Sequence, residues 1–219
     1  MVSHGSSTGT STQDDERISV AIVILAAGAG VRMRESGNKL LAEFDGIPLV
    51  KRVASSAIES TGDSVQVVIG HSPQAIRYAI GSISVRFIEN ADYASGLASS
   101  LKAALSDEVV AAASGAMIML ADMPLVRSAD INRMIEAFLI AGGLSIVRAT
   151  SRGRNGNPVI LPRSLFEEAK AIKGDIGARN IVESSRLDVI EVEIGEAALV
   201  DVDTPEQIVA EGGRVMPNT

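Results

Sequence analysis

One segment, residues 18–39, dictates the rest of the domain and reads ISVAIVILAAGAGVRMRESGNK. Residues 18–25 form a nearly unbroken apolar run, which is typical of a parallel strand buried on both faces. Small residues follow, and glycines at the end of a buried strand allow a tight turn whose N–H groups face an anion. Three cations come next in the chain: Arg32, Arg34 and Lys39. The segment therefore predicts a strand followed by a loop that binds a polyphosphate.

Two common phosphate loops do not match this segment. A dinucleotide-binding turn has the pattern G-x-G-x-x-G, and counting from Gly28 places the bulky Met33 at the third glycine, where it opposes close helix–strand packing. A Walker A loop requires G-x-x-x-x-G-K-[ST], and the chain contains no such run. An ordinary strand and turn with surface cations stays open as the alternative to a phosphate loop.

The composition restricts the class of protein. The 219 residues are 46% hydrophobic, which is enough to bury one substantial core. The formal net charge of -7 argues against a general binder of nucleic acid or membrane surfaces, whose contact surface would be basic. The chain has no cysteine, which excludes disulfides and thiolate metal sites. No apolar run approaches the roughly 18 residues that span a bilayer, so we expect a soluble, cytoplasmic protein.

Strand-like and helix-like segments alternate from Ile18 onward, which predicts a single three-layer, doubly wound α/β domain with a mostly parallel sheet. We place this domain at residues 17–212, between a disordered N-terminal tail, residues 1–16, and a C-terminal tail, residues 213–219. After the first strand, strands are expected at residues 65–69, 83–88, 117–120, 144–147, 159–161 and 199–203. Helices are expected to begin near residues 49, 72, 96, 128 and 204.

Small polar residues follow two of the expected strands, at the edge where ligands collect in open α/β sheets. His71 comes soon after the strand 65–69, and it either contacts a ligand or makes a local hydrogen bond in its loop. Gly96, Ser99 and Ser100 lie at the start of an apolar helix, whose free N–H groups suit a ribose, a base carbonyl or a phosphate. Simple capping of that helix by serine is the alternative.

Aspartates close two distant strands. Asp122 follows the expected central strand 117–120, where it either caps the next turn or holds a cation. Mg²⁺ is a suitable cation, because it needs only one or two protein carboxylates in addition to phosphate oxygens and water. Asp201 and Asp203 share one side of the expected strand 199–203, since side chains alternate along a strand. Thr204 and Gln207 then fit a capping box at the start of the last helix. Solubility alone explains such a pair of aspartate turns poorly.

The second half of the domain should contact a second substrate. Residues 152–158 read as a glycine-rich turn with two arginines, which is either a solvated turn or a flexible anion-binding flap. Further on, Arg179 either pairs with a phosphate or with Glu183 one helical turn later.

Five motifs in order carry a resemblance to a known family. They are LAAGAGVRM with NKLL at residues 25–33 and 38–41, GLASSL at 96–101, LADMP at 120–124, GDIGAR at 174–179 and DVDTPE at 201–206. Together they resemble the nucleotidyltransferases related to the molybdenum-cofactor guanylyl- and cytidylyltransferases. The resemblance covers roughly residues 18–210 and implies a fold like that of the nucleotide-diphospho-sugar transferases.

The resemblance also implies roles for particular residues. The first loop would wrap a nucleoside triphosphate. The implied nucleotide-binding residues are Leu25, Ala26, Ala27, Gly28, Gly30, Arg32, Lys39, Gly96, Ser99 and Ser100. We add His71 to them because of its position after the strand 65–69. The metal ligands, for Mg²⁺, are Asp122 and Asp203, and the catalytic residues are these two with Arg32 and Lys39. The acceptor-binding residues are Arg154, Asn157, Asp175 and Arg179.

The activity that the resemblance implies is a Mg²⁺-dependent transfer of CMP from CTP to molybdopterin, with release of pyrophosphate. CTP is favoured because LAAG, GLASSL and GDIGAR look like the cytidylyl branch. Arg34, Met123 and Asn157 depart from the family's usual Gly, Gln and His, which leaves GTP and another acceptor, such as a sugar or isoprenoid alcohol phosphate, open. A non-catalytic nucleotide-binding accessory protein for a molybdoenzyme also stays open. A recipient molybdoenzyme is a candidate partner, whereas nucleic acid and membranes are not expected.

Overall fold

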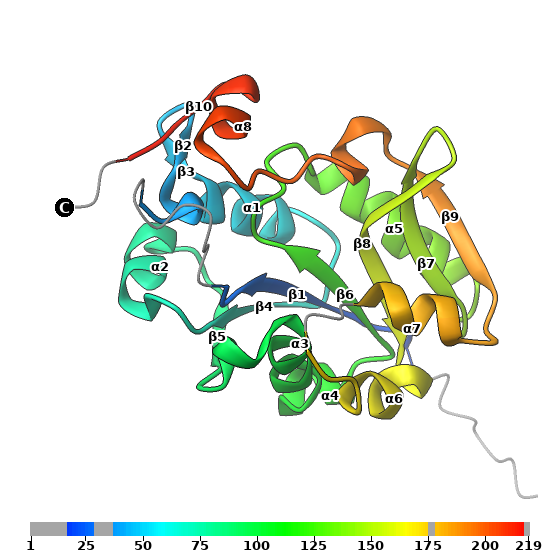
Figure 1. Ribbon diagram of the computed structural model, residues 1–219. Coiled ribbons are helices and arrows are strands. Elements are labelled where there is room, and N and C mark those ends of the chain that lie inside the picture. The colour runs from blue at the N-terminus through cyan, green and yellow to red at the C-terminus, as the bar shows by residue number, and fades with distance from the viewer. Residues whose placement is uncertain (1–16, 29–36, 175–177, 217–219) are drawn as a thin grey trace, which may run out of the picture.

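The computed structural model describes residues 17–28, 37–174 and 178–216. At its centre a seven-stranded sheet has the order β5–β4–β1–β6–β8–β7–β9 (Figure 1). The strands are β1 (Val20–Ala26), β4 (Ser64–Ile69), β5 (Arg86–Glu89), β6 (Gly115–Leu120), β7 (Ile146–Ser151), β8 (Arg154–Pro162) and β9 (Val189–Glu193). All neighbours are parallel except β8, which runs antiparallel to β6 and β7. The expected mostly parallel sheet is confirmed.

The strand β1 explains the apolar run of the first segment. It lies between β4 and β6, and all of its side chains are buried because helices cover both faces of the sheet. Alternate side chains enter two separate cores, with Val20, Ile22 and Ile24 on one face and Ala21, Val23 and Leu25 on the other. A strand in this position can hold no polar side chain without a buried partner.

Helices complete the three expected layers. On one face lie α1 (Leu49–Ile58), α2 (Pro73–Ile80) and α5 (Ser128–Ile140). On the other lie α3 (Leu97–Leu105), α4 (Glu108–Ala112), α6 (Phe166–Lys170) and α7 (Ala178–Ser184). Figure 1 shows α1 and α5 above the sheet and α3, α4 and α6 below it. Among the described residues, no helix has the length and apolar character needed to cross a membrane.

A small second sheet, of order β10–β2–β3, lies beside α8 (Pro205–Ala210). It consists of β2 (Glu43–Phe44), β3 (Ile47–Pro48) and β10 (Gly213–Arg214). Asp45 and Gly46 join β2 to β3 with φ angles of 53° and 76°, as a tight hairpin turn requires. Gly213 and Arg214, which we assigned to the C-terminal tail from the sequence, pair with β2.

Two segments differ from the sequence-based expectations. Residues 199–203 form no strand, because the N–H groups of Leu199 and Val200 donate back to the Glu196 carbonyl instead of entering a ladder. Residues 154–158 are not a turn but the first half of β8, and the turn is confined to Arg152 and Gly153, with φ angles of 50° and 74°. Smaller shifts affect β5, expected at 83–88, and β7, expected at 144–147.

Candidate active site

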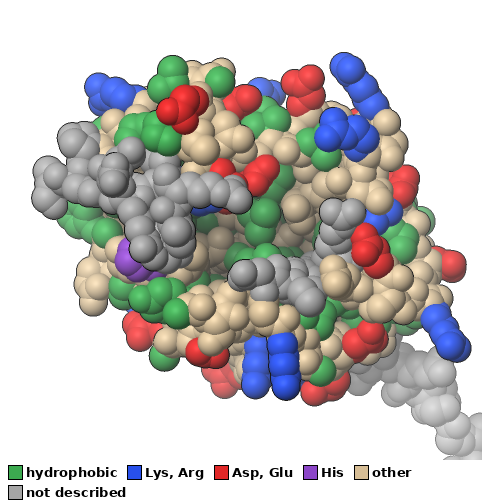
Figure 2. Space-filling view, in the orientation of Figure 1, with side chains coloured by type: hydrophobic (Ala, Val, Ile, Leu, Met, Phe, Trp, Pro, Cys, Tyr) green, Lys and Arg blue, Asp and Glu red, His purple; other side chains and the backbone are tan. Residues whose placement is uncertain are grey.

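The carboxyl ends of β1, β4 and β6 meet at one edge of the sheet. Ala26 pairs with Ile69 and Leu25 pairs with Leu120, so the residues that follow the three strands lie side by side. Figure 2 shows acidic side chains beside a hollow in the middle of the face that this edge borders. Open α/β sheets bind their ligands at this kind of edge.

The start of the first loop offers backbone rather than side chains. The side chains of Leu25, Ala26 and Ala27 are buried in the two cores, so contacts of these residues with a nucleotide would use their N–H and C=O groups. A Cβ built on Gly28 would meet none of the described residues within 4 Å, so they leave space open on that side of the backbone. Gly30, Arg32 and Arg34 lie outside the described residues.

His71 lies beside this loop and pairs with an aromatic side chain that the sequence reasoning missed. The N–H of His71 donates to the Ala27 carbonyl at 3.1 Å, and its ring centroid is 5.9 Å from that of Tyr93, with the two planes tilted by 57°. Gly70 makes room for Tyr93, because a Cβ there would lie 2.5 Å from the Tyr93 Cβ. Tyr93 could have been identified from the sequence, because it is an aromatic residue soon after the end of β5, at the carboxyl edge of the sheet.

A buried asparagine holds the start of α3, where the resemblance places nucleotide-binding serines. The Asn90 amide nitrogen donates to Ser99 Oγ at 2.8 Å and to Ser100 Oγ at 3.0 Å, and Asn90 Oδ1 accepts from the Asp92 N–H at 3.0 Å. Ser99 Oγ also donates to the Gly96 carbonyl at 2.8 Å. Both serine hydroxyls thus have protein partners, and the expected helix start after Gly96 is confirmed. The position of Asn90 at the head of NADYASGL was its only sequence signal.

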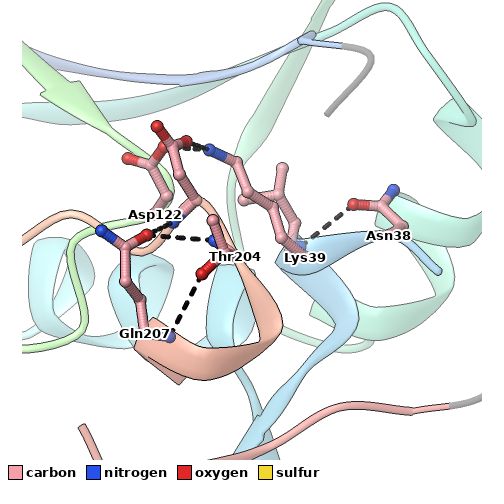
Figure 3. Close-up of polar contacts among 7 residues, drawn as sticks. Asn38, Lys39, Asp122, Thr204 and Gln207 are labelled. Atoms are coloured by element: carbon pink, nitrogen blue, oxygen red, sulfur yellow. Dashed lines mark hydrogen bonds and ion pairs between the residues drawn. The ribbon is translucent and has the colours of Figure 1, made fainter. Parts of the chain in front are cut away.

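Three charged residues from distant parts of the chain form an ion-pair cluster at the same edge. Lys39 Nζ lies 2.6 Å from Asp122 Oδ2 and 2.6 Å from Asp203 Oδ1 (Figure 3). Lys39 opens the short 3-10 turn η2 (Lys39–Leu41), whose N-cap Asn38 accepts from the Leu40 N–H at 3.0 Å. Asp122 follows β6, as the sequence predicts. The cluster joins the end of the first loop to both aspartate motifs.

The main chain fixes the position of Asp203 from two sides. The N–H of Val202 donates to the Asp122 carbonyl at 3.0 Å, which brings the segment 199–203 beside the end of β6. The N–H groups of Asp203 and Thr204 donate to Gln207 Oε1 at 2.8 and 3.0 Å, and the Gln207 N–H donates to Thr204 Oγ1 at 3.3 Å (Figure 3). The expected capping box at the start of α8 is therefore confirmed.

Burial makes the charges of this cluster interact strongly. The Lys39 and Asp122 side chains are only 16% and 15% exposed, and that of Asp203 is 30% exposed. Burial alone would lower the pKa of Lys39, but the charges and hydrogen bonds of the two aspartates outweigh it, so the pKa lies above its ordinary value. Lys39 is therefore an ammonium ion at neutral pH.

A third carboxylate, Asp201, belongs to the same cluster, and the residues present suit a divalent cation. One oxygen from each of Asp122, Asp201 and Asp203 lies within 4.8 Å of the others. Asp122 Oδ1 is buried and has no hydrogen-bond partner among the described residues, and the Lys39 ammonium already acts as a cation between two of the acids. Hard cations such as Mg²⁺ and Mn²⁺ prefer such oxygen ligands. The sequence reasoning assigned no metal role to Asp201.

Two of the acceptor-binding residues that the resemblance implies, Arg154 and Asn157, lie in β8, on the side of β6 opposite to β1. Because β8 is antiparallel to β6, its first residues, including the exposed Arg154 and the half-buried Asn157, lie toward the edge that carries Asp122. Gly156 lets β8 approach the turn η5 (Gly195–Ala198), since a Cβ there would lie 2.1 Å from the Ala198 carbonyl oxygen. Asp175 lies outside the described residues, as does the side chain of Arg179 in α7.

The fold is that of the nucleotidyltransferase class of α/β domains. The chain belongs to the MobA-like NTP transferase domain family, whose model matches residues 22–189. The family resemblance stated from the sequence is thereby confirmed.

Individual relatives are more distant. The bifunctional protein GlmU of Burkholderia multivorans is 31% identical over 116 residues, which cover 53% of this chain but only 25% of that protein. The crystal structure of Rv0371c from Mycobacterium tuberculosis H37Rv is similar with a TM-score of 0.74 and 26% identity, over 88% of this chain and 97% of that chain. A complex of Rv0371c with manganese has a TM-score of 0.72 and 24% identity, with the same coverage.

Proposed function

We propose that this chain is a divalent metal-dependent nucleotidyltransferase that transfers CMP from CTP to molybdopterin and releases pyrophosphate. The observation that carries the proposal is the cluster of Lys39, Asp122 and Asp203 at the carboxyl edge of the sheet, where β6 ends beside β1. Membership of the MobA-like NTP transferase family supports the reaction class. The manganese complex of Rv0371c supports a metal-binding role of the acids by analogy.

The reaction needs charge neutralisation rather than a general base. A phosphate oxygen of the acceptor attacks the α-phosphorus of the nucleotide, and the bond from that phosphorus to the bridging oxygen breaks as pyrophosphate leaves. An acceptor phosphate is already a nucleophile, so the enzyme has to hold two anions together and neutralise the charge that develops at the α-phosphate.

The residues divide this task by their charge. A divalent cation bound by Asp122 and Asp203 would supply Lewis acidity and positive charge to the phosphates. Lys39, which is held as an ammonium ion, would contact the departing pyrophosphate together with Arg32. The backbone of residues 25–28, with Gly30, His71 and the turn at Gly96, Ser99 and Ser100, would hold the nucleotide.

The choice of substrates rests on the sequence motifs. LAAG, GLASSL and GDIGAR support CTP over GTP. Arg154, Asn157, Asp175 and Arg179 would bind the phosphorylated acceptor, and the first two lie in β8, beside β6. Asn157 replaces the family's usual His there, so a sugar or isoprenoid alcohol phosphate is the alternative acceptor that the test below includes.

The test is pyrophosphate release in the presence of Mg²⁺, with CTP, GTP or ATP, and with molybdopterin, a sugar phosphate or an isoprenoid alcohol phosphate. We expect release only with CTP and molybdopterin, and its loss in Asp122→Asn but not in Asp188→Asn, an exposed acid before β9. Release with a different pair would replace the substrates and keep the reaction class. Nucleotide binding without release for every acceptor would instead support a non-catalytic accessory role for a molybdoenzyme.

A further inference from the structure

The cluster at the sheet edge holds more negative charge than its lysine can balance. Three carboxylates, those of Asp122, Asp201 and Asp203, converge within 4.8 Å, and the ammonium of Lys39 directly contacts the first and the third. Among the described residues that these contacts join, one ammonium faces three carboxylates, and a divalent cation would add positive charge to the group.

The local geometry explains why Asp201 points to the same place as Asp203. Val202, between them, is fully buried in the core under α1 and α5, and its N–H is held by the Asp122 carbonyl. Its two neighbours therefore project to the opposite side, toward the end of β6. Asp201 is the more exposed of the two, which suits an acid that meets a cation arriving from solvent.

One further observation points to a ligand rather than to a solvated acidic surface. Asp122 Oδ1 is buried without a hydrogen-bond partner among the described residues, although its other oxygen is paired with Lys39. An unpartnered buried carboxylate oxygen requires an explanation, and a bound cation is one.

We propose that Asp201 is a third metal-binding carboxylate of this site, beside Asp122 and Asp203. The inference rests on the proposed function, because it extends the metal site described there, but it concerns a residue to which the DVDTPE motif assigns no role. Three carboxylates would hold a divalent cation before any nucleotide arrives, whereas one or two carboxylates depend on the nucleotide's phosphates to complete the coordination.

A cysteine substitution tests direct ligation. The chain has no cysteine, so Asp201→Cys introduces the only thiol, and Cd²⁺ bound by a thiolate gives a charge-transfer absorption in the ultraviolet. We expect this absorption in Asp201→Cys and its absence in Asp188→Cys, whose exposed position precedes β9. If Asp201→Cys binds Cd²⁺ as the unmodified chain does but shows no such absorption, residue 201 is not a ligand and the inference fails.

A second measurement separates this inference from the proposed function. Binding of Mn²⁺ without nucleotide is followed by electron paramagnetic resonance in the unmodified chain, Asp122→Asn and Asp201→Asn, with circular dichroism to verify folding. We expect Asp201→Asn to weaken binding by about tenfold or more, the scale on which metal-site partners act. Weakening in Asp122→Asn alone would overturn the role of Asp201 and leave the proposed function intact. If the unmodified chain binds no Mn²⁺, the metal site as a whole is overturned. If the chain binds the metal but releases no pyrophosphate, only the proposed function is overturned.

Discussion

Lys39 Nζ lies 2.6 Å from Asp203 Oδ1, although 164 positions separate the two residues in the chain. The contact joins η2, at the end of the first loop, to the start of α8 (Figure 3). The same ammonium contacts Asp122, so one cation holds together the ends of three segments. The resemblance assigns Lys39 to the phosphates of a nucleotide, and in the structure it lies against the carboxylates that would hold the metal. Its ammonium and a divalent cation therefore compete for the same oxygens.

Lys39→Met tests this competition. We expect tighter Mn²⁺ binding without nucleotide, by about tenfold, because like-charged oxygens close together bind a dication more strongly once the ammonium is gone. We also expect the variant to lose roughly 3 kcal/mol or more of stability without metal, since partly buried carboxylates lose their counter-ion, and to regain it when metal is added. Calorimetric titration and thermal melts measure the two effects. Lys102→Met, in the exposed part of α3, is the control, and equal or weaker Mn²⁺ binding by Lys39→Met would contradict the competition.

Asp122→Asn should lower turnover by about 10²-fold or more, a few kcal/mol on the barrier, because a preorganised electrostatic stabiliser is lost. The same is expected of Asp203→Asn. If the two acids hold one cation, the double variant should be little worse than either single variant, since residues that act as a unit are not additive. Steady-state rates of pyrophosphate release measure all three, and fully additive losses would indicate separate roles.

Asn90→Ala should weaken nucleotide binding and the fold together. The substitution removes the partner of both serine hydroxyls at the start of α3 and of the Asp92 N–H, and unpaired buried polar groups cost about 1–3 kcal/mol. We expect a lower melting temperature and a KM for the nucleotide that rises more than kcat falls. Asn132→Ala is the control, because Asn132 is also an asparagine with side-chain hydrogen bonds, here two that it accepts from Thr61, but on the exposed surface. If the folded Asn90→Ala variant has an unchanged KM for the nucleotide, the nucleotide does not bind at the start of α3.

Two glycine substitutions separate folding from binding. Gly156→Ala places a methyl group 2.1 Å from the Ala198 carbonyl oxygen, so β8 and η5 must move apart, at a cost of about 1–3 kcal/mol or more. The methyl group of Gly28→Ala meets no described residue within 4 Å, so this substitution should leave the melting temperature nearly unchanged while it weakens CTP binding at the first loop. Thermal melts and equilibrium binding of CTP distinguish the two, and a large stability loss in Gly28→Ala would contradict the open space at that position.

Local chemistry made part of the site predictable. A strand buried on both faces strongly favours apolar residues, so β1 was evident from residues 18–25, and Asp122 was expected to emerge where β6 ends. The capping box of Thr204 and Gln207 was evident for the same reason, because it involves residues three apart. By contrast, the prediction of a strand at residues 199–203 was wrong. The alternating pattern of these residues is equally compatible with an irregular segment that one hydrogen bond, from Val202 to Asp122, holds beside β6.

The sequence by itself determined the alternation of strands and helices, the mostly parallel α/β class and the family, since these follow from periodicity and from motifs of a few consecutive residues. Only the tertiary structure decided which charges meet. The pairing of Lys39 with Asp122 and Asp203, the convergence of Asp201 on the same point and the hold of Asn90 on two serines depend on strand order and on register across the sheet. Contacts between residues far apart in the chain arise from the packing of whole elements, and no local pattern encodes them.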